Sequence, residues 1–437
     1  MGNSAKIFQK IKNDPAFKSM CIEFFQMAER ASSINARNEG RHMLMRNSQM
    51  FYVDDASNTK LHDLLRASVK KLGPSFGSTK EVDRLLWRIV CHDWSLNADQ
   101  KATKFIECLG DRAKSEYTYI CANQLFRIRS KTRRVAVGPV EIIAASDPVQ
   151  DIFDGHVNPE WTLTLGPEYA FSSTNGVKIQ LPQTCWKVLV QASQSYVQED
   201  AHWMIDVAIS LIRLSHEYLL LEAIHRGGPA LYPMVGKTEP MPMRIPESET
   251  NYLLLTPDGI STGGMWLPPK YIIDDAVISA MQAPDFTTKA QAIFAPDQGS
   301  LAERVGQGLG WLTRGRQSED RAERFLFFFT AIEALLSSDD KSAPVVQNVA
   351  RNAAVILGND VSERAENASR IKALYADRSA LVHAGKRNVS EPAVNDAQKI
   401  SEELYTRVLK HIPLNNSFSS FQIDLGRATY GLPWPLA

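Results

Sequence analysis

An arginine and a histidine that stand five positions apart could together catalyse acid–base chemistry on a phosphodiester. Residues 378–383 read RSALVH, which places Arg378 and His383 at the two ends of the segment. Histidine exchanges a proton near neutral pH, whereas arginine stays charged and can bind two phosphate oxygens at once. RNA supplies its own nucleophile in the 2′-hydroxyl, so such a pair needs no metal-activated water.

The sequence contains two segments with this spacing, and their interiors distinguish them. Residues 37–42 read RNEGRH, with a charged interior that contains glycine, and we interpret that copy as a loop. The copy at 378–383 has the apolar interior Ala-Leu-Val and lies within a helical pattern. Residues five apart on an ideal helix differ by about 140° in direction. Arg378 and His383 would therefore have to meet at a helix end or across a dimer interface.

A structural role is the alternative interpretation of the same residues. Arg378 could form an ion pair with Glu333 or Asp377, and His383 could cap a helix or pack. Glu333 stands in an apolar helix and needs a partner if it is buried. It could orient Arg378 or His383, or it could satisfy a contact within a helical bundle.

The region that must position this segment, residues 299–412, is predicted to be a series of helices. Apolar residues recur there at helical spacing, and Phe325, Phe328 and Ile332 form a wide apolar stripe. The predicted helices are 301–312, about 320–336, 344–357, one from about 362, and 393–411. The pattern therefore predicts a helical bundle around the Arg/His segment.

Two segments of this region are similar to the signature of a known family. Residues 324–336, RFLFFFTAIEALL, are similar to an apolar helix in which a glutamate, here Glu333, precedes Ala-Leu-Leu. Residues 374–385, LYADRSALVHAG, are similar to an Arg-polar-x3-His signature that glycine follows. The order and separation of the two segments also fit. Residues 299–412 therefore resemble a HEPN domain of the Apea-like group, over about a quarter of the chain.

The resemblance implies an all-helical bundle that often dimerises and brings two Arg/His pairs into one cleft. Many members are metal-independent endoribonucleases of toxin–antitoxin, CRISPR or phage-defence systems. Others are binding or regulatory modules without nuclease activity. Carried onto this sequence, the resemblance makes Arg378 and His383 the catalytic candidates and places Ser379 at the family's polar position, which is commonly Asn, Asp or His.

Two groups of basic residues could contact an RNA backbone. Residues 126–134 read FRIRSKTRR, and on a strand Arg127, Arg129 and Lys131 would share one face. A solvated strand edge that is protected by charge explains the same residues at least as well. The second group surrounds the Arg/His segment and is predicted to bind phosphate: Arg324, Lys386 and Arg387.

The rest of the chain is predicted to be helical at first and mixed afterwards, so the expected fold class is mainly α. We expect an α-rich region over 1–150, a mixed α/β region over 151–298, and a HEPN-like helical domain with a packed tail over 299–437. The predicted elements outside the bundle are helices at 17–30, at 78–90 with a capping box and at 194–225, strands at 126–137 and 161–166, and a hairpin with a long turn at 252–267.

Composition sets the broad class of protein. The 437 residues carry 49 basic and 49 acidic side chains, which argues against a protein that coats nucleic acid through bulk charge. Five widely spaced cysteines indicate reduced thiols rather than disulfides or a zinc site. Without an apolar signal core or a membrane-length apolar stretch, the expected location is the cytoplasm. No segment of the sequence has the residue spacing of a phosphate-binding loop, a dinucleotide-binding motif or a zincin motif. We therefore predict no metal and no cofactor.

Together these patterns predict a metal-independent endoribonuclease that cleaves RNA by 2′-hydroxyl attack and acts as a toxin or an antiphage, abortive-infection effector. Its expected partners are single-stranded RNA or tRNA and a second copy of the chain, in a homodimer or a higher homo-oligomer. An antitoxin or a phage-derived trigger is a further candidate partner, and no membrane is expected. The alternative is a catalytically silent HEPN interaction or sensor module in a defence or regulatory complex.

Overall fold

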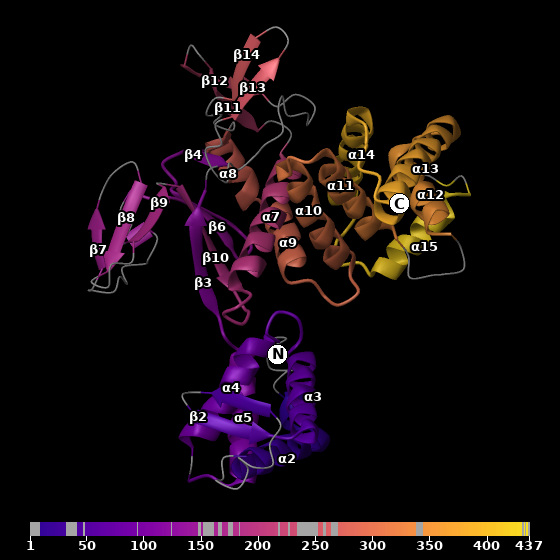
Figure 1. Cartoon of the computed structure of the whole chain (residues 1–437). Helices are drawn as coiled ribbons and strands as arrows, with labels where there is room; N and C mark the ends of the chain where they lie inside the picture. The colour runs from indigo at the N-terminus through magenta and orange to yellow at the C-terminus, as the bar shows by residue number, and fades with distance from the viewer. Residues whose placement is uncertain are drawn as a thin grey trace. The chain divides into compact units, whose positions relative to one another are not determined.

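The computed structural model of the chain contains mainly helices, together with several small sheets (Figure 1). The chain divides into two compact units: unit 1 is Met1–Tyr119 with Leu189–His202, and unit 2 is Ile120–Val188 with Trp203–Ala437. The three regions expected from the sequence, with boundaries at 150 and 298, stay a prediction. The structure describes residues 9–437 except 32–41, 47–48, 94, 124, 147–149, 152–160, 165–167, 174–177, 183, 217–218, 226–227, 234–251, 257–258, 264–269, 338–343, 431, 433 and 436–437.

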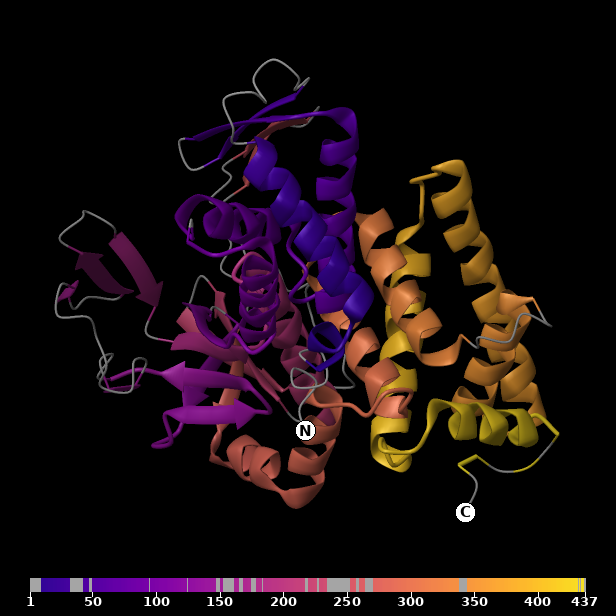
Figure 2. The same ribbon diagram turned by 90° about the horizontal axis from the view of Figure 1, so that it is seen from below.

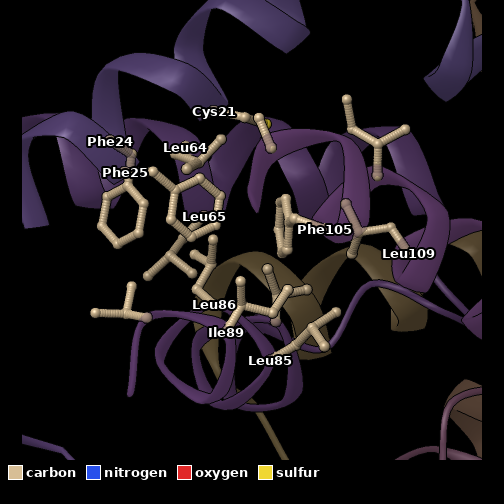
Figure 3. Close-up of a cluster of buried hydrophobic side chains, with 14 of the residues drawn as sticks. Cys21, Phe24, Phe25, Leu64, Leu65, Leu85, Leu86, Ile89, Phe105 and Leu109 are labelled. Carbon is tan, nitrogen blue, oxygen red and sulfur yellow. The ribbon is translucent and has the colours of Figure 1, made fainter. Parts of the chain in front are cut away.

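Unit 1 packs helices and a β-hairpin around an apolar core. Its elements are α2 (Pro15–Ala31), β1 (His42–Arg46), β2 (Gln49–Val53), α3 (Asp55–Leu72), α4 (Thr79–His92) and α5 (Ala98–Arg112). Figure 3 shows side chains of these helices gathered in one cluster, among them Phe24, Phe25, Leu64, Leu86 and Phe105. Each of these five is 1% exposed or less. Burying a side chain of this size stabilises the fold by about 2 kcal/mol.

Two helices of unit 1, α2 and α4, match helices predicted from the sequence, apart from one cap. Helix α2 confirms the helix predicted at 17–30. Helix α4 begins at Thr79 as predicted, but the capping box is wrong, because Ser78 makes no side-chain cap hydrogen bond. Glu81 instead accepts hydrogen bonds from Ser195 and Arg112. These long-range partners occupy the carboxylate that a capping box would require.

The sheets belong mainly to unit 2. The strands are β3 (Tyr117–Ala122), β4 (Phe126–Arg129), β5 (Arg134–Val137), β6 (Val140–Ala144), β7 (Trp161–Thr164), β8 (Glu168–Ser173), β9 (Lys178–Pro182), β10 (Thr184–Val190), β11 (Leu220–His225), β12 (Gly228–Pro233), β13 (Tyr252–Thr256), β14 (Gly259–Gly263) and β15 (Lys270–Asp274). The strand orders are β3-β10-β6-β5, β12-β11-β15-β4, β7-β8-β9 and β13-β14. Strand β15 pairs with β4 in parallel. The rings of Phe126 and Tyr271, on these two strands, lie 5.4 Å apart.

Strand pairing overturns the helix predicted over 194–225. Helix α7 (Val197–Ser215) accounts for its first part and ends ten residues before the predicted end. Leu220–His225 forms β11 instead, which pairs with β12 on one side and β15 on the other. Two strand partners thus override the helical spacing of the apolar residues.

Two further strand predictions are corrected in detail. The strand predicted at 126–137 is two strands, β4 and β5, which pair with different neighbours. The first strand of the hairpin predicted over 252–267 is confirmed as β13, but it pairs with β14, and Thr256 stands opposite Gly259. The predicted long turn is wrong because residues 259–263 form β14, and the second strand predicted at 265–267 lies outside the described residues. The strand predicted at 161–166 is confirmed over 161–164 as β7, and residues 165–166 lie outside the described part of the chain.

The C-terminal part of unit 2 is a bundle of helices, drawn from orange to yellow in Figures 1 and 2. Its elements are α8 (Asp275–Gln282), α9 (Pro284–Phe294), α10 (Leu301–Gln317), α11 (Arg321–Leu336), α12 (Val345–Leu357), α13 (Val361–Ala384), α14 (Glu391–His411) and α15 (Phe418–Ala428). These bounds confirm the helices predicted over 299–412. The apolar stripe of α11, including Phe325, Phe328 and Ile332, is completely buried. No helix in the described part of the chain combines the length and apolarity that crossing a membrane requires.

A close approach of α10 and α14 depends on one glycine. A Cβ atom at Gly308 would stand 1.4 Å from the hydroxyl of Tyr405. That hydroxyl donates a hydrogen bond of 2.8 Å to the carbonyl of Ala331, on α11. Gly308 therefore makes the space in which Tyr405 joins the helices.

The C-terminal tail packs back onto the bundle through α15, as its aromatic residues predict. Phe418 and Phe421 are buried, and the guanidinium of Arg304 lies 4.6 Å from the ring centre of Phe418. Tyr430 is 91% exposed, so this aromatic residue takes no part in the packing.

Candidate functional site

Helix α13 carries the Arg/His segment and leaves most of its surface exposed. Asp360 caps its N-terminus by accepting a hydrogen bond of 2.9 Å from the N–H of Glu363. Gly385 ends the helix at a φ of +63°, a left-handed conformation that glycine adopts without steric cost. The buried residues of this helix are Ile371 and Leu374. A narrow stripe therefore attaches α13 to the bundle, and its last residues, 382–384, are exposed.

Arg378 forms an ion pair with Glu333 of α11. The Nη2 atom of Arg378 lies 3.0 Å from Oε2 of Glu333, and the two side chains are 23% and 18% exposed. Burial raises the pKa of Glu333 above its ordinary value, while the adjacent guanidinium opposes this rise. The guanidinium also lies 6.0 Å from the ring centre of Tyr375. These contacts hold Arg378 in one place at the surface of the bundle.

Helices α11 and α13 run in opposite directions, so the end of α13 lies beside the start of α11. Arg378 contacts Glu333 near the end of α11, and Arg387 contacts Asp320, the residue that precedes α11, at 2.6 Å. Asp320 also caps α11 by accepting a hydrogen bond from the N–H of Glu323. That hydrogen bond and the guanidinium of Arg387 lower the pKa of Asp320. The segment that contains His383 is thus anchored on both sides.

His383 stands on this anchored segment with its side chain exposed, and Ser379 is half-buried. Neither side chain makes a hydrogen bond to any residue that the structure describes. Lys386 is exposed, and Arg324, on the first turn of α11, donates a hydrogen bond of 3.4 Å to Gln398. The structure therefore gathers the second basic group and His383 at the same end of the bundle.

The first basic group lies elsewhere in unit 2. Arg127 and Arg129 are exposed and alternate along β4, the edge strand of its sheet. Strand β4 ends at Arg129, so the pattern no longer places Lys131 on the same face, and that prediction is wrong. Figure 1 shows α7, α10 and α11 between β4 and α13. This arrangement matches a charged strand edge that discourages edge-to-edge pairing.

A buried charge cluster was not predicted from the sequence. The Oε1 atom of Glu402, on α14, lies 2.8 Å from Nη2 of Arg213 in an ion pair, and Glu402 also pairs with Arg316 of α10. All three side chains are at most 5% exposed. The signal in the sequence was Arg213, a charged residue in the apolar run of a predicted helix. Since the cluster is enclosed and connects α7, α10 and α14, its role is structural.

Three of the five cysteines are poor nucleophiles at neutral pH. The five cysteines form no disulfide, and burial raises the pKa of Cys21 to about 12, of Cys121 to about 11 and of Cys185 to about 12. Thiols with such pKa values carry little of the reactive thiolate. Within the described ranges, no three His, Cys, Asp or Glu side chains come together as a metal-binding group.

Comparisons with known proteins do not assign this chain to a family. A scan against protein-family models, a search of curated proteins and a search of solved structures each return no match.

Proposed function

We propose that the chain is a metal-independent endoribonuclease of HEPN type, with Arg378 and His383 as its catalytic residues. The observation that supports it is the end of α13, where an exposed histidine follows an arginine that Glu333 holds in place. Lys386 and Arg387 come directly after this segment and can attract a phosphate backbone. The resemblance of residues 324–336 and 374–385 to the HEPN signature supports the same reaction.

In the proposed reaction His383 takes the proton of the ribose 2′-hydroxyl, and the 2′-oxygen attacks the adjacent phosphorus. The bond from phosphorus to the 5′-oxygen breaks, water donates a proton to that leaving oxygen, and His383 releases the proton that it took. The products are a 2′,3′-cyclic phosphate and a 5′-hydroxyl end. Arg378 stabilises the charge that develops on the non-bridging oxygens, and Glu333 positions Arg378.

The proposed active form is a homodimer in which the α13 ends of two copies form one cleft. Two observations support it. Residues five apart point about 140° apart on a helix, so one copy presents Arg378 and His383 in different directions. Val382, between them, is 46% exposed although it is apolar. The proposal includes a cytoplasmic role as a toxin or antiphage effector, which rests on the resemblance alone.

A catalytically silent interaction or sensor module is the second candidate function. The ion pair of Arg378 with Glu333 favours it, because a guanidinium already neutralised by a carboxylate is a common structural contact.

Cleavage of RNA by the purified full chain, in the presence of a chelator, distinguishes the two candidates. We expect wild type to leave cyclic phosphate ends, and His383→Ala and Arg378→Ala to reduce the cleavage rate at least about 100-fold. His411→Ala is the matched control, since His411 is also an exposed histidine in the last turn of a helix. It should cleave at the wild-type rate.

The variant Glu333→Gln tests whether the ion pair serves catalysis. As a positioning residue, Glu333 should affect the catalytic rate more than the Michaelis constant, and Glu333→Asp should restore part of the rate. A wild-type chain that cleaves no RNA, or a His383→Ala variant that cleaves equally well, would favour the silent module or another site.

A further inference from the structure

A polar hollow in unit 1 is lined by none of the residues discussed as catalytic candidates. Its volume is about 200 Å³, and it forms where the start of α4, the end of α5 and the segment after β10 meet. Glu81 and Arg84 come from α4, Arg112 from α5, Tyr117 from the start of β3, and Ser193 from the segment after β10. Each of these residues belongs to unit 1.

The lining offers more hydrogen-bond donors than acceptors and a net positive charge. The carboxylate of Glu81 already has hydrogen-bond partners within the protein. It accepts a hydrogen bond of 2.6 Å from Nη1 of Arg112 and one of 2.7 Å from the N–H of Ser195. Because Arg112 makes this contact through one nitrogen, its remaining N–H groups can serve a ligand. Arg84 is exposed and adds a second positive charge to the lining. Two guanidiniums and one carboxylate leave the hollow with one excess positive charge.

Ser193 supplies an independent sign that the hollow is a binding site. This residue is 3% exposed, and its Oγ atom is buried without a hydrogen-bond partner among the described residues. The backbone N–H of Ser193 donates a hydrogen bond of 2.8 Å to the carbonyl of Ser75, and this bond holds the backbone beside the hollow. A buried hydroxyl without a partner costs free energy, so natural structures rarely retain one without a reason.

The size of the hollow limits the ligand. A volume of about 200 Å³ is several times the ≈ 30 Å³ that one water occupies in the liquid, so a single water would not fill it. It is below the 300–1,000 Å³ of pockets that enclose drug-sized ligands. The space suits a small anion, or the charged end of a larger molecule.

We propose that this hollow binds a phosphate group, with Arg84 and Arg112 as its donors and with the hydroxyl of Ser193 as a further donor once rotation of its side chain turns the buried Oγ atom into the hollow. Guanidinium groups bind phosphate oxygens through parallel hydrogen bonds, and hydroxyls satisfy the remaining oxygen lone pairs. The tyrosine hydroxyl of Tyr117 and Ser115 are further donors on the lining. The phosphate belongs either to inorganic phosphate or to a nucleoside monophosphate. This site is independent of the proposed nuclease and would allow unit 1 to sense a phosphorylated small molecule.

Calorimetric titration of the full chain tests the site. Sodium phosphate and a ribonucleoside 5′-monophosphate are titrated separately at constant ionic strength, with sodium chloride as the reference. We expect saturable binding of one phosphate group to one chain. If phosphate and the nucleoside monophosphate bind with equal affinity, the site is assigned to inorganic phosphate. If the nucleoside monophosphate binds more tightly, the site is assigned to a nucleotide. Absence of saturable binding for both ligands would overturn the proposal.

Three variants locate the binding. Arg84→Gln and Ser193→Ala should each weaken phosphate binding about tenfold, because each removes a donor to a charged group. Ser193→Ala removes no hydrogen bond of the free protein, so its thermal unfolding without phosphate should match wild type. Arg88→Ala is the matched control, an exposed arginine one turn further along α4 that does not line the hollow. Unchanged affinity in both Arg84→Gln and Ser193→Ala would overturn the assignment.

The variant His383→Ala separates this site from the proposed nuclease. It should bind phosphate as wild type does, because residue 383 lies in the other unit. A loss of phosphate binding in this variant would move the site to α13 and contradict the proposal for unit 1.

Discussion

Asp206 of α7 shows at the residue scale how burial changes the behaviour of an ion pair. Its Oδ2 atom accepts a hydrogen bond of 3.2 Å from Nε of Arg314, and its side chain is 11% exposed. Burial raises the pKa of Asp206 to about 7, although the hydrogen bond and charge of Arg314 oppose the rise. The guanidinium of Arg314 also lies 4.8 Å from the ring centre of Trp203. Proton uptake by Asp206 is therefore coupled to folding near neutral pH.

The substitution Asp206→Asn tests this coupling. The pKa of Asp206 is about 7 in the folded chain and ordinary in the unfolded chain, so the folded state binds the proton more tightly. Protonation therefore stabilises the folded state, and this contribution is complete below about pH 4. That contribution is lost as the pH rises to 7, and it amounts to at most about 4 kcal/mol. Asparagine does not titrate, so only the wild type should lose this stability as the pH rises. The free energy of unfolding of the variant minus that of wild type should therefore increase between pH 4 and pH 8.

Urea denaturation of both proteins across this pH range provides the measurement. Ser279→Ala, a change at an exposed helical residue, serves as the control and should differ from wild type by a constant amount. A constant difference for Asp206→Asn as well would contradict the raised pKa.

At the scale of elements, local patterns predicted the helices well, and long-range contacts decided the rest. The apolar stripe of α11 can be inferred from the sequence because it depends on neighbouring residues. Strand β11 could not, since its partners β12 and β15 determine its conformation. The spacing of Arg378 and His383 could be recognised in the sequence, whereas nothing in the sequence indicated the hollow in unit 1. Its lining residues are far apart in the chain, and only the fold brings them together.

Gly385 gives a prediction for the end of α13. Nothing lies within 4 Å of a Cβ built at this position, so Gly385→Ala would meet no steric contact and only the left-handed φ would be strained. We expect the free energy of unfolding to fall by about 1 kcal/mol. Gly426→Ala is the contrasting control, because Gly426 lies within α15, also with open space around it. There alanine should stabilise by up to about 1 kcal/mol.

Denaturation of the two variants under the same conditions measures the contrast. If Gly385→Ala were as stable as wild type, α13 would not end in the left-handed conformation. The consequence for function is direct, because that conformation turns the chain from His383 towards the start of α11.

At the scale of the whole molecule, a net charge of zero limits how RNA can be bound. With 49 basic and 49 acidic side chains, the chain has no excess positive charge to attract RNA from all sides. Affinity must therefore come from a local group of cations. The bundle provides one such group at the end of α13, and β4 provides another, on a different part of unit 2.

The salt dependence of RNA binding distinguishes these two groups. Each phosphate contact on a single strand contributes about −0.7 to the slope of log affinity against log salt concentration. Binding of one RNA through Arg324, Lys386 and Arg387 of a single copy predicts a slope of about −2, and additional use of Arg127, Arg129 and Lys131 of that copy predicts about −4. We expect about −2, because the two groups lie on opposite sides of α7, α10 and α11 (Figure 1).

Fluorescence anisotropy of a labelled single-stranded RNA with the His383→Ala chain would measure this slope without cleavage. Lys386→Gln should make the slope shallower by about 0.7, whereas a double change of Arg127 and Arg129 to glutamine should leave it unchanged. A slope near −4 that becomes shallower in the double variant would instead place the RNA on β4. The cations of the strand edge would then serve binding rather than solubility, and the substrate would have to span the bundle.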